Sequence, residues 1–142
     1  MTEPIQTCMD RWNQHLRGEL PGGLDAMLHP DCVFLSPIVF TPQVGRDITK
    51  LYLGAAGNTL GGDGAAVGDA ASSFGYTKKV LSGNHAVLEF ETTIDGVLVN
   101  GVDIITCDDD AMITEFKVMI RPLKAINLVH QQMKAMLEKM SQ

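Results

Sequence analysis

The feature that most limits the fold is the run of residues 76–121, where apolar and polar side chains alternate between short turns. Asp95-Gly96 is a two-residue hairpin signal of the type I′ kind. Ser82-Gly83-Asn84 and Asp108–Ala111 mark two further turns. The pattern predicts four consecutive antiparallel strands over residues 76–81, 86–94, 97–107 and 112–121.

Helical patterns flank this predicted meander. One apolar stripe begins the chain and ends before Gly18, and its members are Ile5, Met9, Trp12 and Leu16. Further helices are expected over 24–28, over 46–53 and from Pro122 onward, with a short strand over 32–37. Helices before and after a meander predict an α+β architecture with the helices packed on one face of the sheet.

The length of 142 residues suits one domain, which we expect to span residues 1–142. Residues 54–75 are rich in Gly and Ala, bury little surface and keep much backbone entropy. We expect a mobile loop there. Two interpretations stay open, a lid over a pocket and an ill-ordered excursion.

Charge and hydropathy exclude several classes of partner. The chain has 17 acidic and 11 basic residues and a net charge of −6, which argues against a nucleic-acid binder. No apolar run approaches the roughly 20 residues that span a membrane. The N-terminal residues lack the apolar stretch of a signal peptide, so we expect a cytoplasmic protein.

No motif indicates a metal ion or a cofactor. Cys8, Cys32 and Cys107 are widely spaced and contain no CxxC pair. The histidines form no HExxH pair, and Asp108–Asp110 lacks the spacing of a calcium loop, so a turn is the better interpretation. We therefore expect no metal ion and no cofactor.

The residue that stands out chemically is Asp103, a single carboxylate within the apolar run Gly101–Ile105. Burial of an unpaired carboxylate is costly, so such a group is exposed, hydrogen-bonded or protonated. Two interpretations follow: a residue on a solvated or dimer-contact face, and a pocket carboxyl able to move a proton. Glu89 and Glu91, which alternate with apolar neighbours, are expected on the solvated face.

The chain resembles the SnoaL-like branch of the nuclear transport factor 2-like superfamily. The resemblance is carried by "HPDCVFLSP", "GRDITKLYL", the strand pair around "DGVLVNGVD" and the end "ITEFKVMIRPL". It implies a cone-shaped fold, in which a curved antiparallel sheet wraps around helices and a deep apolar pocket, and commonly a homodimer. The superfamily includes ketosteroid isomerases, polyketide cyclases and binding modules, so the fold alone does not select a function.

The resemblance allows individual positions of this chain to be compared with the catalytic residues of that superfamily. Asp103 falls where ketosteroid isomerases hold a protonated Asp, whereas Trp12 replaces their Tyr and Ser36 replaces their general base. (That isomerase is a worked example of a carboxylic acid kept neutral.) Two of the three roles are altered, which disfavours that mechanism. The single acid/base Asp of SnoaL-type cyclases matches Asp103 better, and Gly101 replaces the Arg of limonene epoxide hydrolases.

We therefore expect a protein that binds a small, apolar, carbonyl-bearing molecule, with Asp103 as the catalytic acid/base of an isomerase- or cyclase-type reaction. The alternative is a hydrophobic-ligand-binding or dimerisation module without turnover. A further possibility is self-association through the sheet face that carries Glu89, Glu91, Glu115 and Lys117. The expected pocket lining is Trp12, Phe34, Ser36, Tyr52, Phe90, Phe116, Val118 and Ile120.

Overall fold

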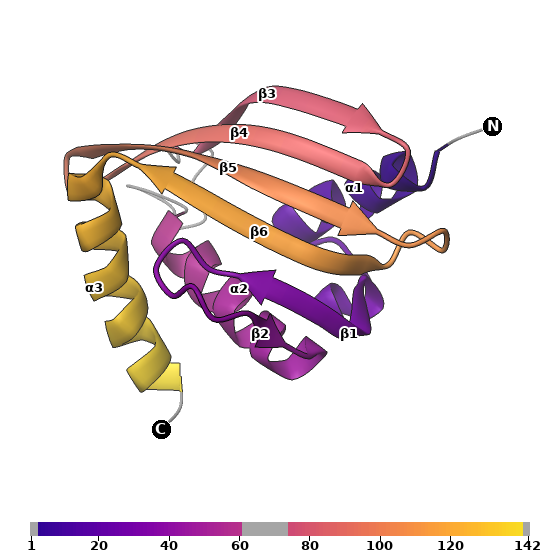
Figure 1. The fold of residues 1–142 in the computed structure, drawn as a ribbon, viewed down its shortest axis with the longest axis horizontal. Coiled ribbons are helices and arrows are strands. Elements are labelled where there is room, and N and C mark those ends of the chain that lie inside the picture. The colour runs from indigo at the N-terminus through magenta and orange to yellow at the C-terminus, as the bar shows by residue number, and fades with distance from the viewer. Residues whose placement is uncertain (1–2, 61–73, 141–142) are drawn as a thin grey trace.

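The computed structural model describes residues 3–60 and 74–140 (Figure 1). Its helices are α1 (Pro4–Leu16), the 3₁₀ turn η1 (Gly23–Ala26), α2 (Arg46–Leu60) and α3 (Leu123–Met140). Its strands are β1 (Leu28–Leu35), β2 (Gln43–Val44), β3 (Gly75–Ser82), β4 (His85–Ile94), β5 (Val97–Cys107) and β6 (Ile113–Arg121).

The six strands form one sheet in the order β2-β1-β6-β5-β4-β3. The meander β3–β6 is confirmed, and positive φ angles of 50° at Asp95 and 78° at Gly96 fit the expected type I′ turn. The sheet is not wholly antiparallel, because β1 pairs parallel with β6. That pairing joins strands far apart in the sequence and needs a long crossover, so no local turn signal announces it.

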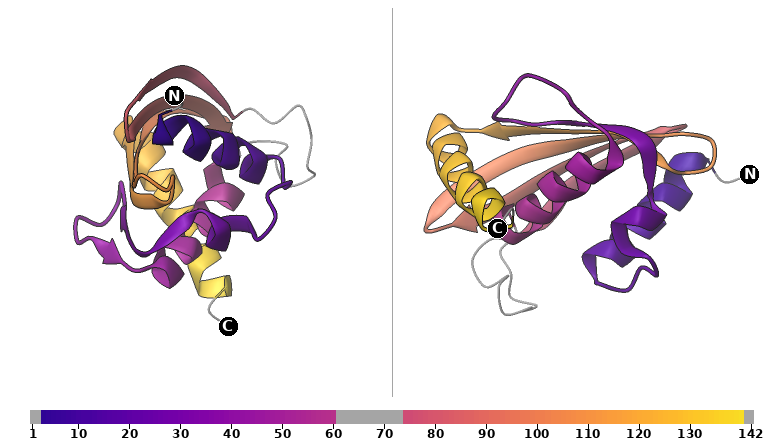
Figure 2. Two further views of the ribbon diagram at one scale, coloured as in Figure 1. Left: turned by 90° about the vertical axis from the view of Figure 1, so that its right-hand side faces the viewer. Right: turned by 90° about the horizontal axis from the view of Figure 1, so that it is seen from below.

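The helices lie on the concave side of the sheet. Figure 2 shows the sheet arched over α1 in one view and the helices gathered on one side of it in the other. Helix α2 packs against β1 and α3, and α3 contacts β5 and β6. Buried apolar side chains from helices and sheet form the core between them. The predicted α+β class, with a curved sheet around helices, is confirmed.

Helix α1 is tied to the sheet at its first turn. Pro4 occupies its first position, where its missing N–H costs no hydrogen bond. The backbone N–H of Ile5 donates to the Gly83 carbonyl at 3.0 Å, and the Gly83 N–H donates to the Glu3 carboxylate at 2.7 Å. These two bonds hold α1 against the β3–β4 turn and thereby position Trp12.

Three segments differ from the sequence-based expectations. The helix expected over 24–28 is only η1, and Leu28 already begins β1. The short strand β2 was not expected. Helix α2 continues beyond residue 53 to Leu60, since alanines favour the helical state, so the first part of the expected 54–75 loop is helical. Residues 61–73 of that loop lie outside the described residues, and Gly75 already begins β3.

Candidate functional site

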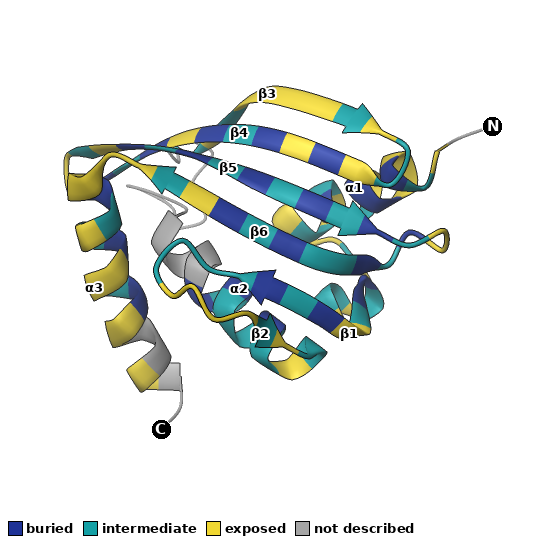
Figure 3. Cartoon of the chain, viewed as in Figure 1, coloured by how far each residue is buried: buried dark blue, intermediate teal, exposed yellow. Residues whose placement is uncertain are grey.

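Asp103 lies on the buried side of the central strand β5. From Val99 onward every second residue of β5 is buried, and Figure 3 shows this alternation along the strand. Asp103 falls in the buried row, between Gly101 and Ile105. Its side chain is only 6% exposed. The solvated-face interpretation of Asp103 is therefore wrong, and its carboxyl group needs a partner within the protein.

Asp103 is the last member of a hydrogen-bonded chain of three side chains, Trp12, Tyr76 and Asp103, which we call the relay. The Tyr76 hydroxyl donates to Oδ2 of Asp103 at 2.9 Å. The Trp12 indole N–H in turn donates to the Tyr76 oxygen at 3.0 Å. Within the described part of the chain, the other carboxyl oxygen, Oδ1, accepts no hydrogen bond. The relay therefore satisfies one oxygen of Asp103, whereas the other has no hydrogen-bond partner among the described residues.

Tyr76 reaches Asp103 from a strand that is not paired with β5. Strand β4 separates β3 from β5 in the sheet, so the long phenol side chain crosses β4 to meet the carboxyl group. A register shift between Tyr76 and Lys78 marks a bulge at this point of β3. Bulges redirect side chains next to functional sites. The Phe74 ring packs edge-on against the Tyr76 ring at 5.2 Å and helps to fix its direction.

The burial of this site changes its acid–base chemistry. Loss of hydration raises the pKa of Asp103 from its ordinary 3.8 to about 7, and the hydrogen bond from Tyr76 opposes part of that rise. Burial, followed by the charge of Asp103, also raises the pKa of Tyr76 well above its ordinary value. Tyr76 thus stays a hydrogen-bond donor near neutral pH, while Asp103 exists in both protonation states.

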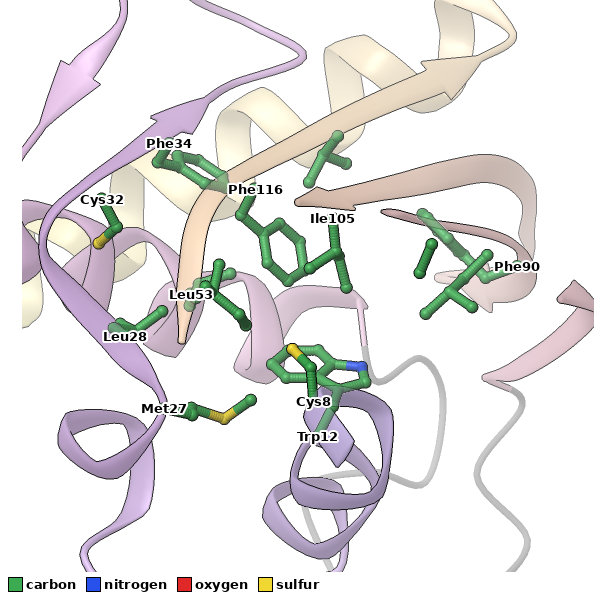
Figure 4. Close-up of a cluster of buried hydrophobic side chains, with 14 of the residues drawn as sticks. Cys8, Trp12, Met27, Leu28, Cys32, Phe34, Leu53, Phe90, Ile105 and Phe116 are labelled. Atoms are coloured by element: carbon green, nitrogen blue, oxygen red, sulfur yellow. The ribbon is translucent and has the colours of Figure 1, made fainter. Parts of the chain in front are cut away.

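Trp12 belongs to the buried core beneath the sheet. Its ring packs against Phe116 with centroids 5.2 Å apart, and against His15 at 5.3 Å. In Figure 4 its indole nitrogen points away from Phe116, toward the side of the cluster where Phe90 lies. Burial lowers the pKa of His15, so its imidazole favours the neutral form. Trp12 is therefore held by aromatic packing while its N–H serves the relay.

The structure joins several expected pocket residues in one aromatic run. Tyr52 stacks on Phe34 at 5.2 Å, and Phe34 lies 6.2 Å from Phe116, which contacts Trp12. Phe34 and Phe116 are almost completely buried. This run belongs to the core and connects α2, through the sheet, to the relay at Asp103.

Phe90 is buried beside the relay because Gly101 leaves it room. A Cβ atom at Gly101 would collide with the Phe90 ring and would lie 2.7 Å from the Met119 carbonyl oxygen. Gly101 pairs with Phe90 across β4 and β5. The glycine at this position is thus required by packing, and it lies two residues from Asp103.

Ser36 and Tyr52 line a separate cavity of about 230 Å³ between the β1–β2 connection, α2 and α3, together with His130 and Met133. Oγ of Ser36 accepts the N–H groups of Ile38 at 3.0 Å and Val39 at 3.3 Å, so it organises a turn. No hydrogen bond joins Ser36 to Asp103 among the residues the structure describes. Val118 and Ile120 contribute to a groove of about 540 Å³ beside Phe40.

The sequence reasoning missed Tyr76, which it treated only as the start of a strand. A signal was present, because Phe74 and Tyr76 are two aromatic residues at a spacing of two, before the polar run Thr77–Lys79. Side chains with that spacing share one face of a strand. An isolated aromatic face on a polar edge strand indicates inward packing.

The described residues contain no group of three or more His, Cys, Asp or Glu side chains that could hold a metal ion. Nor does any helix within residues 3–60 and 74–140 have the length and apolar character needed to cross a membrane.

Comparisons with known proteins find similarity at the level of structure. No family model and no curated protein matches the sequence. A steroid delta-isomerase from Pseudomonas aeruginosa superposes with a TM-score of 0.83 at 27% identity, over 98% of this chain and 95% of that one. An uncharacterised protein with a cystatin-like fold from Silicibacter pomeroyi gives 0.74 at 26% identity, over 90% and 83%.

A third similar structure is a nuclear transport factor 2-like protein of unknown function from Mesorhizobium loti, with a TM-score of 0.65 at 18% identity over 84% of this chain and 92% of that one. The expected SnoaL-like branch stays a prediction. The architecture and these neighbours show that the chain has the nuclear transport factor 2-like fold.

Proposed function

We propose that this protein binds a small, apolar, carbonyl-bearing molecule and transfers a proton next to its carbonyl group, with Asp103 as acid and base. The observation that carries the proposal is the buried carboxyl group of Asp103, with Oδ2 bound by Tyr76 and Oδ1 without a partner in the described chain. A pKa of about 7 supports it, because an acid/base catalyst works best when its pKa lies near the working pH.

The chemistry is that of an isomerase or cyclase and consumes no cofactor. The ionised carboxylate removes a proton from the carbon next to the carbonyl, and the electron pair moves into an enolate. The carboxylic acid then returns the proton to another carbon, or the enolate carbon attacks an electrophile within the same molecule. In the isomerisation the proton count is unchanged. The similarity to a steroid delta-isomerase, at 27% identity, supports this class.

The experiment is an isomerisation assay with a β,γ-unsaturated ketone, whose conversion to the conjugated ketone increases ultraviolet absorbance. We expect Asp103→Asn to lower turnover by about 10²- to 10⁴-fold, the usual contribution of a positioned acid or base. Glu89→Gln is the matched control, because Glu89 is a carboxylate on the neighbouring strand β4 that binds Asn100 at 3.0 Å outside the relay. Equal turnover in the parent protein and Asp103→Asn would refute the proposal.

A second candidate function is binding without turnover. It is favoured by two observations. None of His15, Tyr52 or His130 hydrogen-bonds to Asp103 in the described structure, and Ser36 is engaged in its turn. Trp12 is the one tryptophan of the sequence, so its fluorescence reports on the site. Saturable quenching by the ketone, without isomerisation or solvent-deuterium uptake into the ketone, would favour this candidate.

We also propose that the protein forms a homodimer through apolar side chains left on its surface. Phe40 is fully exposed, Val44 and Leu98 are largely exposed, and Met119 is about half exposed. Phe40 and Met119 flank the 540 Å³ groove. Sedimentation equilibrium tests this proposal: Phe40→Ser should shift the parent dimer toward monomer, whereas Val80→Thr, at an exposed position of edge strand β3, should not. A monomeric parent protein would refute it.

A further inference from the structure

We infer that Trp12 is a positioning residue that fixes which oxygen of Asp103 carries the proton, and that this oxygen is Oδ1. The inference rests on the proposed function, because it identifies the atom that would exchange the proton with the ligand. It follows from the two hydrogen bonds Trp12–Tyr76 and Tyr76–Asp103 and from which atoms of these three side chains can donate or accept a hydrogen bond.

The first step concerns the direction of the chain. An indole N–H donates and never accepts, so the oxygen of Tyr76 must accept the bond of 3.0 Å from Trp12. A phenol has a single hydrogen, and its remaining partner is Oδ2 of Asp103 at 2.9 Å. Tyr76 therefore points its hydrogen at Asp103. A tyrosine without the indole would be free to turn and accept a proton from Asp103 instead.

The second step concerns the carboxyl group. Oδ2 accepts the hydrogen of Tyr76, and the carbonyl oxygen of a carboxylic acid is a much better acceptor than its hydroxyl oxygen. The neutral acid thus carries its proton on Oδ1, which accepts no bond from the described part of the chain. The same atom takes up the proton when the carboxylate acts as base and returns it when the acid acts. Oδ2 and Tyr76 keep their bond throughout.

The third step concerns the rigidity of the donor. Trp12 is 6% exposed and is held by Phe116 and by α1, whose first turn is bound to Gly83. Its N–H therefore has little freedom to leave Tyr76. The relay is therefore held in place from the core side of the sheet. It favours ligands that exchange a proton with one carboxyl oxygen alone.

The test is infrared difference spectroscopy of the ligand-free protein, with the Asp103 band identified by its loss in Asp103→Asn. At a pH where Asp103 is protonated, its C=O oxygen in the parent protein is Oδ2, which accepts a hydrogen bond and absorbs at low frequency. Trp12→Phe keeps an aromatic ring but removes the donor, so we expect the band to shift to higher frequency. In a Tyr76→Phe background, Trp12→Phe should cause no further shift.

An unshifted band in Trp12→Phe would overturn the inference, and so would an equal shift with and without Tyr76, which would indicate packing alone. Because no ligand is present, these outcomes are independent of turnover, and failure of the proposed function would appear only in the isomerisation assay.

A second measurement needs no Trp12 variant. The one tryptophan gives a single indole N–H signal by NMR, and we expect it to follow the titration of Asp103 in the parent protein. The dependence should disappear in Tyr76→Phe and should persist in His15→Gln, which removes the titratable ring beside Trp12. An indole N–H signal whose position does not change with the Asp103 titration in the parent protein, or still changes with it in Tyr76→Phe, would overturn the inference.

Discussion

The Tyr76 hydroxyl lies 2.9 Å from Oδ2 of Asp103, although strand β4 stands between the strands that carry the two residues. The bond spans the inner face of the sheet, and the Trp12 indole behind it sets its direction. A buried carboxyl group with one oxygen bound in this way keeps a raised pKa and yet has a defined orientation. Three predictions about stability follow from this arrangement and from the packing that supports it.

Stability should fall as the pH rises through the Asp103 titration. The pKa of the folded state, about 7, lies above the ordinary 3.8, so between these values the folded protein binds more protons than the unfolded chain. This stabilisation is complete below pH 4 and is lost as the pH approaches and passes 7. We expect Asp103→Asn, a neutral isostere, to flatten this dependence and to be more stable than the parent protein at pH 8 by up to a few kcal/mol.

The measurement is urea unfolding at a series of pH values, with Glu89→Gln as the matched carboxyl-to-amide control on the neighbouring strand β4. An Asp103→Asn profile that runs parallel to the parent profile would show that the carboxyl group does not titrate with a raised pKa.

Gly101→Ala should destabilise the protein by about 1–3 kcal/mol, the usual cost of overpacking. The added Cβ collides with the Phe90 ring and approaches the Met119 carbonyl oxygen at 2.7 Å, and backbone atoms cannot move aside as a flexible side chain can. Gly75→Ala is the matched control, since a Cβ there meets no atom within 4 Å. Thermal unfolding distinguishes the two variants, and equal stability of both would contradict the packing described around Phe90.

Glu3→Gln should weaken the attachment of α1 to the β3–β4 turn. The carboxylate accepts the Gly83 N–H at 2.7 Å. The amide oxygen of Gln is a weaker, uncharged acceptor, so we expect a loss within the roughly 0.5–1.5 kcal/mol that a typical hydrogen bond contributes. We also expect faster hydrogen exchange of the Ile5 amide, which donates to the Gly83 carbonyl. Glu19→Gln, which breaks the exposed pair with Arg17, should change stability by less. Unchanged Ile5 exchange in Glu3→Gln would refute this role.

The sequence predicted the elements more fully than the site. Turn signals and alternation located all four meander strands, because hairpins are local structures. The parallel pairing of β1 with β6 was not predicted, since it depends on a crossover rather than on a turn. The last part of α2 was not predicted either, because a segment rich in Gly and Ala suggests a loop, whereas alanine favours the continuation of a helix that has already begun.

Asp103 was singled out from the sequence, but its side of the sheet was not determined. Both faces of β5 carry apolar residues, such as Val102 and Ile104 on one face and Val99 and Ile105 on the other, so alternation alone is ambiguous. Tyr76 was missed because its link to Asp103 joins non-adjacent strands, and its link to Trp12 spans 64 residues. Contacts at such separations follow from the curvature of the sheet, which no local pattern encodes.

The most direct test of the account is a ¹³C NMR titration of the Asp103 carboxyl carbon, assigned by comparison with Asp103→Asn. The account predicts an apparent pKa of about 7 in the parent protein. A pKa at or below about 4, the value of a hydrated aspartate, would contradict it, because the carboxyl group would then be neither desolvated nor poised to exchange a proton near neutral pH.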